Sequence, residues 1–195
     1  GTIRTRTLPS ADYSLFAKAL ADEPPYPKIQ SRVSASGGMV TTGDAAPDFT
    51  APAADGDVSP FTLSEHLDEA PVVLAFFPAA FTGTCTDEMC HFRDEMGQFD
   101  DIGATVYGIS IDTPFTLNEF RAQNELGFTL ISDTNRRIID AYDISYDFED
   151  LGVFAVAQRS VFVIDAEGTI TYSWFSDNPG QEPDYDAVAA AAADV

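Results

Sequence analysis

The stretch Val72–Met96, VVLAFFPAAFTGTCTDEMCHFRDEM, combines a buried strand, a loop and the start of a helix that carries a cysteine. The run Val72–Phe77 is apolar without alternation and rich in β-branched and aromatic residues, which predicts a strand covered on both faces. Pro78 ends this run, and Thr82-Gly83-Thr84 supplies residues that favour a turn and a helix cap. A strand–loop–helix unit is therefore expected here.

A helix whose first turn carries Cys85 is expected to run to about Asp101. Its apolar side chains recur at spacings of three and four, as on one helix face: Met89, Phe92, Met96 and Phe99. Cys85 begins this stripe at the helix end where unpaired backbone N–H groups and the positive end of the dipole stabilise a thiolate. A cysteine on an apolar helix face is usually an inert core residue, but this position also suits a nucleophile.

The length, composition and charge of the chain limit the kinds of protein it can be. The chain has 195 residues, 45% of them hydrophobic, which suits one domain with a sizeable core. A net charge of −22 argues against nucleic acid or an anionic membrane as partner. No apolar run approaches the ~20 residues of a membrane span, and no secretory signal is expected. The two cysteines do not form a secreted disulfide framework, so a reducing, cytoplasmic location is predicted.

The charge is distributed unevenly. Of the 10 basic and 32 acidic residues, five and three respectively lie in residues 1–38, so the other 157 residues hold five basic and 29 acidic ones and no lysine. Because Met39 follows Ser36-Gly37-Gly38, residues 1–38 are interpreted as a vector-derived or upstream extension that function does not need, and residues 39–195 as the domain. The acid-rich, lysine-free body resembles cytoplasmic proteins of extreme halophiles, where salt screens carboxylate repulsion.

The order of the remaining elements predicts the fold class. A hairpin is expected at 48–53 and 59–63, then a short helix at 63–68 capped by Ser64. After the central unit follow strands at 104–111 and 128–131, helices at 115–125 and 136–142, an irregular loop at 144–157, a hairpin at 160–165 and 169–175, and a helix at 184–193. This order predicts an α/β protein with a mixed central sheet flanked by helices, the thioredoxin-like arrangement.

Three ordered motifs resemble those of the peroxiredoxins. Pro78, Thr82 and Cys85 stand as P-x-x-x-T-x-x-C directly after the buried strand, and FFPAAFTGTCTDEMC resembles the active-site signature of that family. The segment GDAAPDF (43–49) resembles the family's opening segment, and QRSVFVID (158–165) resembles the strand that carries its active-site arginine. The resemblance extends from about Thr42 to the end of the chain.

The resemblance implies roles for individual residues. Cys85 would be the peroxidatic cysteine, which attacks a hydroperoxide as thiolate and becomes a sulfenic acid. Arg159 would stabilise the thiolate and bond the peroxide oxygens, Thr82 would hydrogen-bond the sulfur or the peroxide, and Pro78 would exclude solvent. The implied enzyme uses no metal, haem or flavin, reduces hydrogen peroxide or organic hydroperoxides, accepts electrons from a thioredoxin- or glutaredoxin-like protein, and forms a homodimer.

The role of Cys90 stays open. Its C-x4-C spacing from Cys85 resembles the peroxiredoxin Q, or bacterioferritin comigratory protein, branch, in which the second cysteine resolves the sulfenic acid. The phrase EMCHFRD also resembles the alkyl hydroperoxide reductase E branch, whose members often use one cysteine. Five helical residues rise ~7.5 Å and turn ~140°, which exceeds the ~7 Å Cα separation of a disulfide. A Cys85–Cys90 bond therefore requires the helix to unwind, and otherwise Cys90 is a spectator.

The two histidines and Glu88 allow other interpretations. His91 and His66 could suggest a Cys–His hydrolase or a metal site, but His91 points away from Cys85 along the helix and C-x4-C-H is not a zinc spacing, so both are expected at the surface. Glu88 is expected to contact the backbone or an arginine near the first turn. A thiol-disulfide oxidoreductase is disfavoured because there is no C-x-x-C, whereas a redox sensor using the same thiol remains an alternative.

Overall fold

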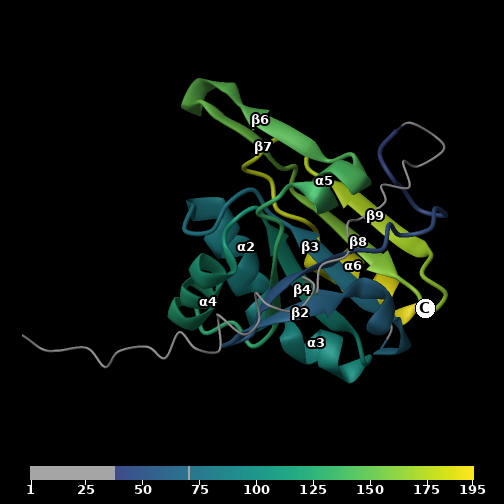
Figure 1. Cartoon of the computed structure of the whole chain (residues 1–195). Helices are drawn as coiled ribbons and strands as arrows, with labels where there is room; N and C mark the ends of the chain where they lie inside the picture. The colour runs from purple at the N-terminus through teal and green to yellow at the C-terminus, as the bar shows by residue number, and fades with distance from the viewer. Residues whose placement is uncertain (1–37, 70) are drawn as a thin grey trace, which may run out of the picture.

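The strand predicted at residues 72–77 is β3 (Val72–Phe76), which lies inside a mixed seven-stranded sheet of the computed structural model (Figure 1). The structure describes residues 38–69 and 71–195. The strand order is β2-β1-β5-β4-β3-β8-β9, in which β3, β4 and β5 are parallel and the other neighbouring pairs are antiparallel. The other strands are β1 (Thr50–Ala54), β2 (Val58–Thr62), β4 (Thr105–Ser110), β5 (Thr129–Ser132), β8 (Ser160–Ile164) and β9 (Ile170–Phe175).

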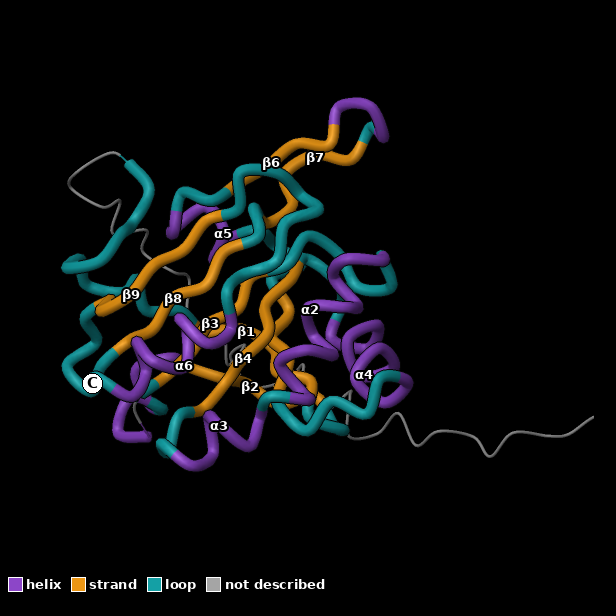
Figure 2. The backbone as a smooth tube through the Cα atoms, turned by 180° about the vertical axis from the view of Figure 1, so that it is seen from behind, coloured by secondary structure: helices purple, strands orange, loops and turns teal. Residues whose placement is uncertain are grey.

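Both faces of the sheet are covered, which explains why β3 is apolar throughout. Val73, Ala75 and Phe77 face a core shared with α2 (Gly83–Asp94), α3 (Met96–Asp101), α4 (Pro114–Gln123) and α6 (Tyr185–Ala193). Val72, Leu74 and Phe76 face a second core that includes α5 (Arg137–Tyr142) and the β1–β2 region. Figure 2 looks onto the first of these faces, with α6 in front of the strands. The predicted mixed sheet flanked by helices is confirmed.

Gly108 allows α2 to pack closely on β4. A Cβ at this position would lie 2.6 Å from Leu130 Cδ2 and 3.0 Å from Met89 Sδ, closer than side-chain atoms normally approach. Met89 is one helical turn after Cys85. The absence of a side chain at residue 108 therefore helps to set the height of the cysteine-bearing helix above the sheet.

Two predicted helices differ in detail. The helix expected from Cys85 to about residue 101 is divided at Glu95 into α2 and α3, although Phe92 and Phe99 still face the same core. Residues 63–68 were predicted as one helix, but they form the 3₁₀ turns η1 (Leu63–Glu65) and η2 (Leu67–Glu69). Ser64 is not the cap, because the Asp48 carboxylate accepts hydrogen bonds from its N–H and hydroxyl at 2.9 and 2.8 Å.

The prediction of an irregular loop at 144–157 is wrong, because this segment forms a second, two-stranded sheet. Strands β6 (Ser145–Phe148) and β7 (Val153–Ala157) pair antiparallel around the 3₁₀ turn η3 (Glu149–Leu151), and the hairpin projects from the body (Figures 1 and 2). Gly152 takes a positive φ of 64° at its turn, and Asp147 Oδ1 accepts a bond from the Ala155 N–H at 2.8 Å. Most side chains of the hairpin are exposed on both faces. The sequence therefore lacks the alternation of apolar and polar residues that predicts a strand.

The extension predicted at 1–38 lies, apart from Gly38, outside the described residues. Val40 is the first residue of the described chain to be buried, and its N–H bonds the Tyr142 carbonyl at 3.4 Å. Among the described residues, none of the helices has the length and apolar character needed to cross a membrane.

Candidate active site

Cys85 lies in the first turn of α2, two residues after Gly83 begins the helix. Its side chain faces the core between the helices and the sheet, and the residue is only 2% exposed. The thiol is free rather than disulfide-bonded. As predicted, the cysteine starts the inward stripe that continues with Met89 and Phe92.

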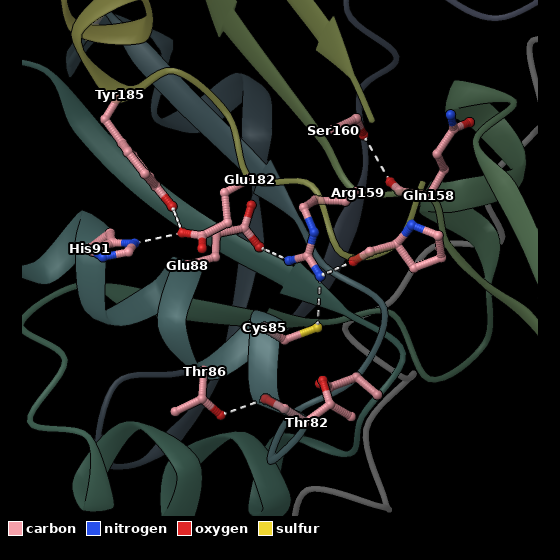
Figure 3. Close-up of polar contacts among 12 residues, drawn as sticks. Thr82, Cys85, Thr86, Glu88, His91, Gln158, Arg159, Ser160, Glu182 and Tyr185 are labelled. Carbon is pink, nitrogen blue, oxygen red and sulfur yellow. Dashed lines mark hydrogen bonds and ion pairs between the residues drawn. The ribbon is translucent and has the colours of Figure 1, made fainter. Parts of the chain in front are cut away.

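Arg159 brings a buried positive charge to this thiol (Figure 3). It lies between β7 and β8, and its Nη2 is 3.3 Å from Cys85 Sγ and 2.9 Å from the carbonyl oxygen of Pro179. Its Nη1 donates to the Glu88 carboxylate, so both ends of the guanidinium fork are held. A guanidinium fixed in this way stabilises a thiolate and still offers a planar set of donors to an incoming oxygen.

Glu88 is the part of the site that sequence reasoning described too weakly. It is fully buried one turn after Cys85, and its carboxyl group accepts a hydrogen bond from Arg159 Nη1. Burial raises the pKa of Glu88 to about 8, against the opposing pull of the Arg159 charge. Its Oε1 and Arg159 Nε have no hydrogen-bond partner among the described residues. The sequence does hold a signal for the burial of Glu88, because this carboxylate lies on the apolar helix face that Cys85 begins.

Pro78 and Thr82 lie in the loop between β3 and α2. Pro78 is buried and, with Arg159, Pro179 and Tyr146, it lines a small hollow. Thr82 is the N-cap residue of α2, and its hydroxyl donates to the Ala79 carbonyl at 3.0 Å. The structure therefore brings Pro78 to Arg159, while the Thr82 hydroxyl is engaged by its own loop.

A second polar group lies behind Glu88. Glu182 Oε2 bonds His91 Nδ1 at 2.5 Å and the Tyr185 hydroxyl at 2.6 Å, and so links α2 to the segment before α6 (Figure 3). His91 is exposed, as predicted, although it is paired. His66 is not simply at the surface, because its ring is half-buried and stacks on Phe61 with 4.3 Å between centroids.

Cys90 faces a different neighbourhood from Cys85. Its half-buried thiol points to the end of α4, where Asn124 Oδ1 lies 3.8 Å and Arg93 Nη1 lies 3.6 Å from Sγ. The structure does not join the two cysteines, since both thiols are free. Within residues 38–69 and 71–195 there is no group of three or more His, Cys, Asp or Glu side chains placed to hold a metal ion.

Comparisons with known proteins identify the family. The family model described as "AhpC/TSA family" matches residues 42–173. A putative peroxiredoxin of Mycobacterium tuberculosis is 37% identical over 138 residues, which cover 70% of this chain and 86% of the relative. The putative peroxiredoxin bcp of Coxiella burnetii is 33% identical over 136 residues, covering 69% of this chain and 88% of the relative.

Solved structures agree with this assignment. The crystal structure of peroxidoxin BcpB from Mycobacterium tuberculosis matches with a TM-score of 0.70 at 30% identity, covering 80% of this chain and 98% of that one. The reduced 2-Cys peroxiredoxin of Plasmodium vivax shares the fold at 23% identity, with a TM-score of 0.68 over 77% of this chain and 79% of that one. The predicted thioredoxin-like fold is thereby confirmed. The chain belongs to the AhpC/TSA family and is a peroxiredoxin, an enzyme that reduces peroxides with a cysteine thiol.

Proposed function

We propose that Cys85 is the peroxidatic nucleophile and that Arg159 is its activating cation. The observation that carries this assignment is the buried contact of 3.3 Å between Arg159 Nη2 and Cys85 Sγ, with the guanidinium held by Glu88 and the Pro179 carbonyl. In a site closed to water, a fixed cation stabilises the thiolate and the charge that develops on the departing oxygen.

The reaction follows from these positions. The Cys85 thiolate attacks the terminal oxygen of a hydroperoxide, so that an S–O bond forms and the O–O bond breaks. The sulfur is oxidised to a sulfenic acid, and the departing alkoxide or hydroxide takes up a proton to leave as alcohol or water. We assign Pro78 to the exclusion of solvent, since it offers no N–H, and we propose that the Thr82 hydroxyl exchanges its bond to the Ala79 carbonyl for one to the bound peroxide. No metal or organic cofactor takes part in the proposed reaction.

We assign Cys90 as the resolving cysteine. The two residues lie five positions apart on one helix, so α2 must unwind before their sulfur atoms meet. The first turn of α2 suits such a change, because Thr82 and Gly83 are exposed and the Thr82 side chain makes no capping bond within the described chain. The product is a Cys85–Cys90 disulfide and a molecule of water.

The proposed partners are a thioredoxin- or glutaredoxin-like reductant and a second copy of the chain. A dithiol protein would return the disulfide to two thiols, which is consistent with a reducing, cytoplasmic location. A homodimer would cover apolar side chains exposed on the active-site loop, α4 and the β6–β7 hairpin: Phe81, Phe115, Leu151, Val153 and Phe154.

We also propose that residues 39–195 form the whole catalytic unit. The described site draws all its members from Pro78 to Tyr185. A chain beginning at Met39 should therefore keep peroxidase turnover within about two-fold of the full chain. A large loss on removal of residues 1–38 would show instead that the extension contributes to the enzyme.

The test is intact mass after one equivalent of hydrogen peroxide, on wild type and Cys90→Ser, with and without a sulfenic-acid trap. The two-cysteine cycle predicts that wild type loses about 2 Da and that Cys90→Ser gives a trappable species about 16 Da heavier. A lasting trap adduct in wild type would make Cys90 a spectator. If neither protein reacted at low peroxide, the assignment of Cys85 as peroxidatic nucleophile would fail, and a Cys85→Ser control identifies the sulfur that reacts.

A further inference from the structure

The second cysteine also has an arginine of its own. Arg93 lies three residues after Cys90 in α2, and its Nη1 is 3.6 Å from Cys90 Sγ. Cys85 has the same kind of neighbour in Arg159, whose Nη2 is 3.3 Å from that sulfur. Each thiol of this chain is therefore in contact with a guanidinium group.

The guanidinium of Arg93 is held in place from two other sides. Its Nη1 donates to the Asn124 carbonyl at 2.7 Å, and its Nε and Nη2 both lie 2.7 Å from Asp94 Oδ1. Asn124 also approaches the thiol with its side chain: Nδ2 donates to the Phe120 carbonyl at 2.8 Å, so Oδ1 faces Cys90 Sγ at 3.8 Å. The sulfur thus meets one acceptor and one cation, both fixed by the end of α4.

Positive charge is scarce in the part of the chain that carries the two cysteines. Residues 39–195 contain 29 acidic side chains and five arginines as their only basic residues. Two of those five arginines contact the two sulfur atoms of the cysteines. In a chain so poor in positive charge, a cation beside each thiol indicates a task that both thiols share.

We propose that Arg93 activates Cys90 for the resolving step and that Asn124 positions it; this inference rests on the proposed two-cysteine function. Arg93 stabilises the Cys90 thiolate, which attacks the sulfur of the Cys85 sulfenic acid. The Cys90 thiolate supplies the electron pair of the new S–S bond as the S–O bond of the sulfenic acid breaks, and the hydroxide that leaves takes a proton to become water. Arg93 bonds the Asn124 carbonyl and so holds the helical turn that contains Cys90 against α4. We therefore assign the unwinding of α2 to residues 83–89.

The first test isolates Cys90 in the Cys85→Ser protein and measures its alkylation by iodoacetamide at a fixed neutral pH. Arg93→Gln should slow this reaction about 3- to 5-fold, the effect of a partly exposed ion pair, whereas Arg93→Lys should restore much of the rate. The matched control is Arg121→Gln, which removes the same charge from an arginine that bonds the Phe128 carbonyl, and it should leave the rate unchanged. Circular dichroism confirms that each variant is folded.

The second test follows wild type and Arg93→Gln after one equivalent of hydrogen peroxide. Arg93→Gln should form the sulfenic acid at the wild-type rate but close the disulfide about 3- to 5-fold more slowly, with Arg93→Lys between them. Equal rates of alkylation and of disulfide closure in wild type and Arg93→Gln would overturn the inference. A wild type that forms a lasting sulfenic acid would overturn it too, while leaving Cys85 as peroxidatic. A protein that forms no sulfenic acid would fail at the proposed function itself.

Discussion

The two cysteines of this peroxiredoxin share one helix and one kind of partner, but they differ in burial. Cys85 is 2% exposed, and its arginine is enclosed by Glu88, the Pro179 carbonyl and the sheet. Cys90 is half-buried, and Arg93 is tied to an exposed aspartate and to the end of α4. The same pair of chemical groups is thus placed once in a water-poor site and once near the surface.

Under the proposed two-cysteine cycle, this difference in burial would separate two reactions between two thiols of one helix. A charge interaction is several-fold stronger in a buried site than near water, so the Arg159–Cys85 contact has more effect on reactivity than the Arg93–Cys90 contact. The strong contact suits the attack on a peroxide, where new charge must be stabilised. The weak contact suits a thiol that reacts only after the helix has opened.

The largest effect is expected when the buried arginine is replaced. Arg159→Lys should slow oxidation of Cys85 by about 100-fold, because an ammonium cannot bond the sulfur, Glu88 and an incoming oxygen in one plane. Rapid mixing with peroxide and a sulfenic-acid trap measures this rate. Arg93→Lys is the matched control and should leave it within about two-fold. Equal losses in the two variants would abolish the distinction between the sites.

The next effect comes from the packing below Cys85. Gly108→Ala places a methyl group 2.6 Å from Leu130 Cδ2 and 3.0 Å from Met89 Sδ, and should lower the free energy of unfolding by about 2 kcal/mol. Cys85 oxidation should slow, while alkylation of Cys90 should change less. Urea unfolding gives the stability, and Gly97→Ala serves as control because its position in α3 is open. An unchanged stability would show that the sheet can absorb the extra carbon.

A smaller difference is expected in access to the two thiols. With each cysteine alone, in Cys90→Ser and Cys85→Ser proteins, labelling by a bulky maleimide is compared with labelling by iodoacetamide. The bulky reagent should be disfavoured at Cys85 by roughly 10-fold more than at Cys90, because the buried thiol needs a local opening. Mass spectrometry measures both rates. The same size preference at both positions would contradict the difference in burial.

The last comparison concerns the buried carboxyl beside Arg159 and its dependence on pH. Because the pKa of Glu88 is raised to about 8, the folded chain keeps a proton that the unfolded chain releases near the ordinary value of 4.5. The free energy of unfolding should therefore fall as pH rises between these values, by at most about 1.4 kcal/mol per pH unit. Urea unfolding should show a flatter profile in Glu88→Gln than in wild type.

The control for this pH experiment is Glu119→Gln, which removes a carboxylate from the exposed face of α4. It should keep the wild-type slope. If Glu88→Gln and Glu119→Gln gave the same profile as wild type, the buried carboxyl would not be the group that binds the proton.

The strand and helix at the centre of the fold could be predicted because the spacing of their apolar residues fits only one type of secondary structure each. The unbroken apolar run of β3 and the three- and four-residue spacing of α2 each satisfy a single geometry. The β6–β7 hairpin could not be found in this way, because most of its side chains meet solvent on both sides. The break at Glu95 was also invisible, since the apolar stripe passes through it.

Residues of the site could be predicted only where a sequence motif or the resemblance to a family identified them. The contact between Arg159 and Cys85 spans 74 residues, and that between Arg159 and Glu88 spans 71. No local periodicity reports such pairs, so Glu88 could be given no more than an unspecified arginine as a partner. The group around Cys90 includes Asn124, which is 34 residues away at the end of another helix. This contact exists only in the folded chain, so no local sequence pattern predicts it.

The bond between Arg159 and the Pro179 carbonyl has a consequence for how the enzyme is made. During synthesis on a ribosome, Cys85 is followed 74 residues later by Arg159, and Arg159 another 20 residues later by Pro179. The cation proposed to activate the thiol can bond the Pro179 carbonyl only after that last segment has emerged. Under the proposed function, a nascent chain therefore carries its cysteine for much of translation before the thiol gains its full reactivity.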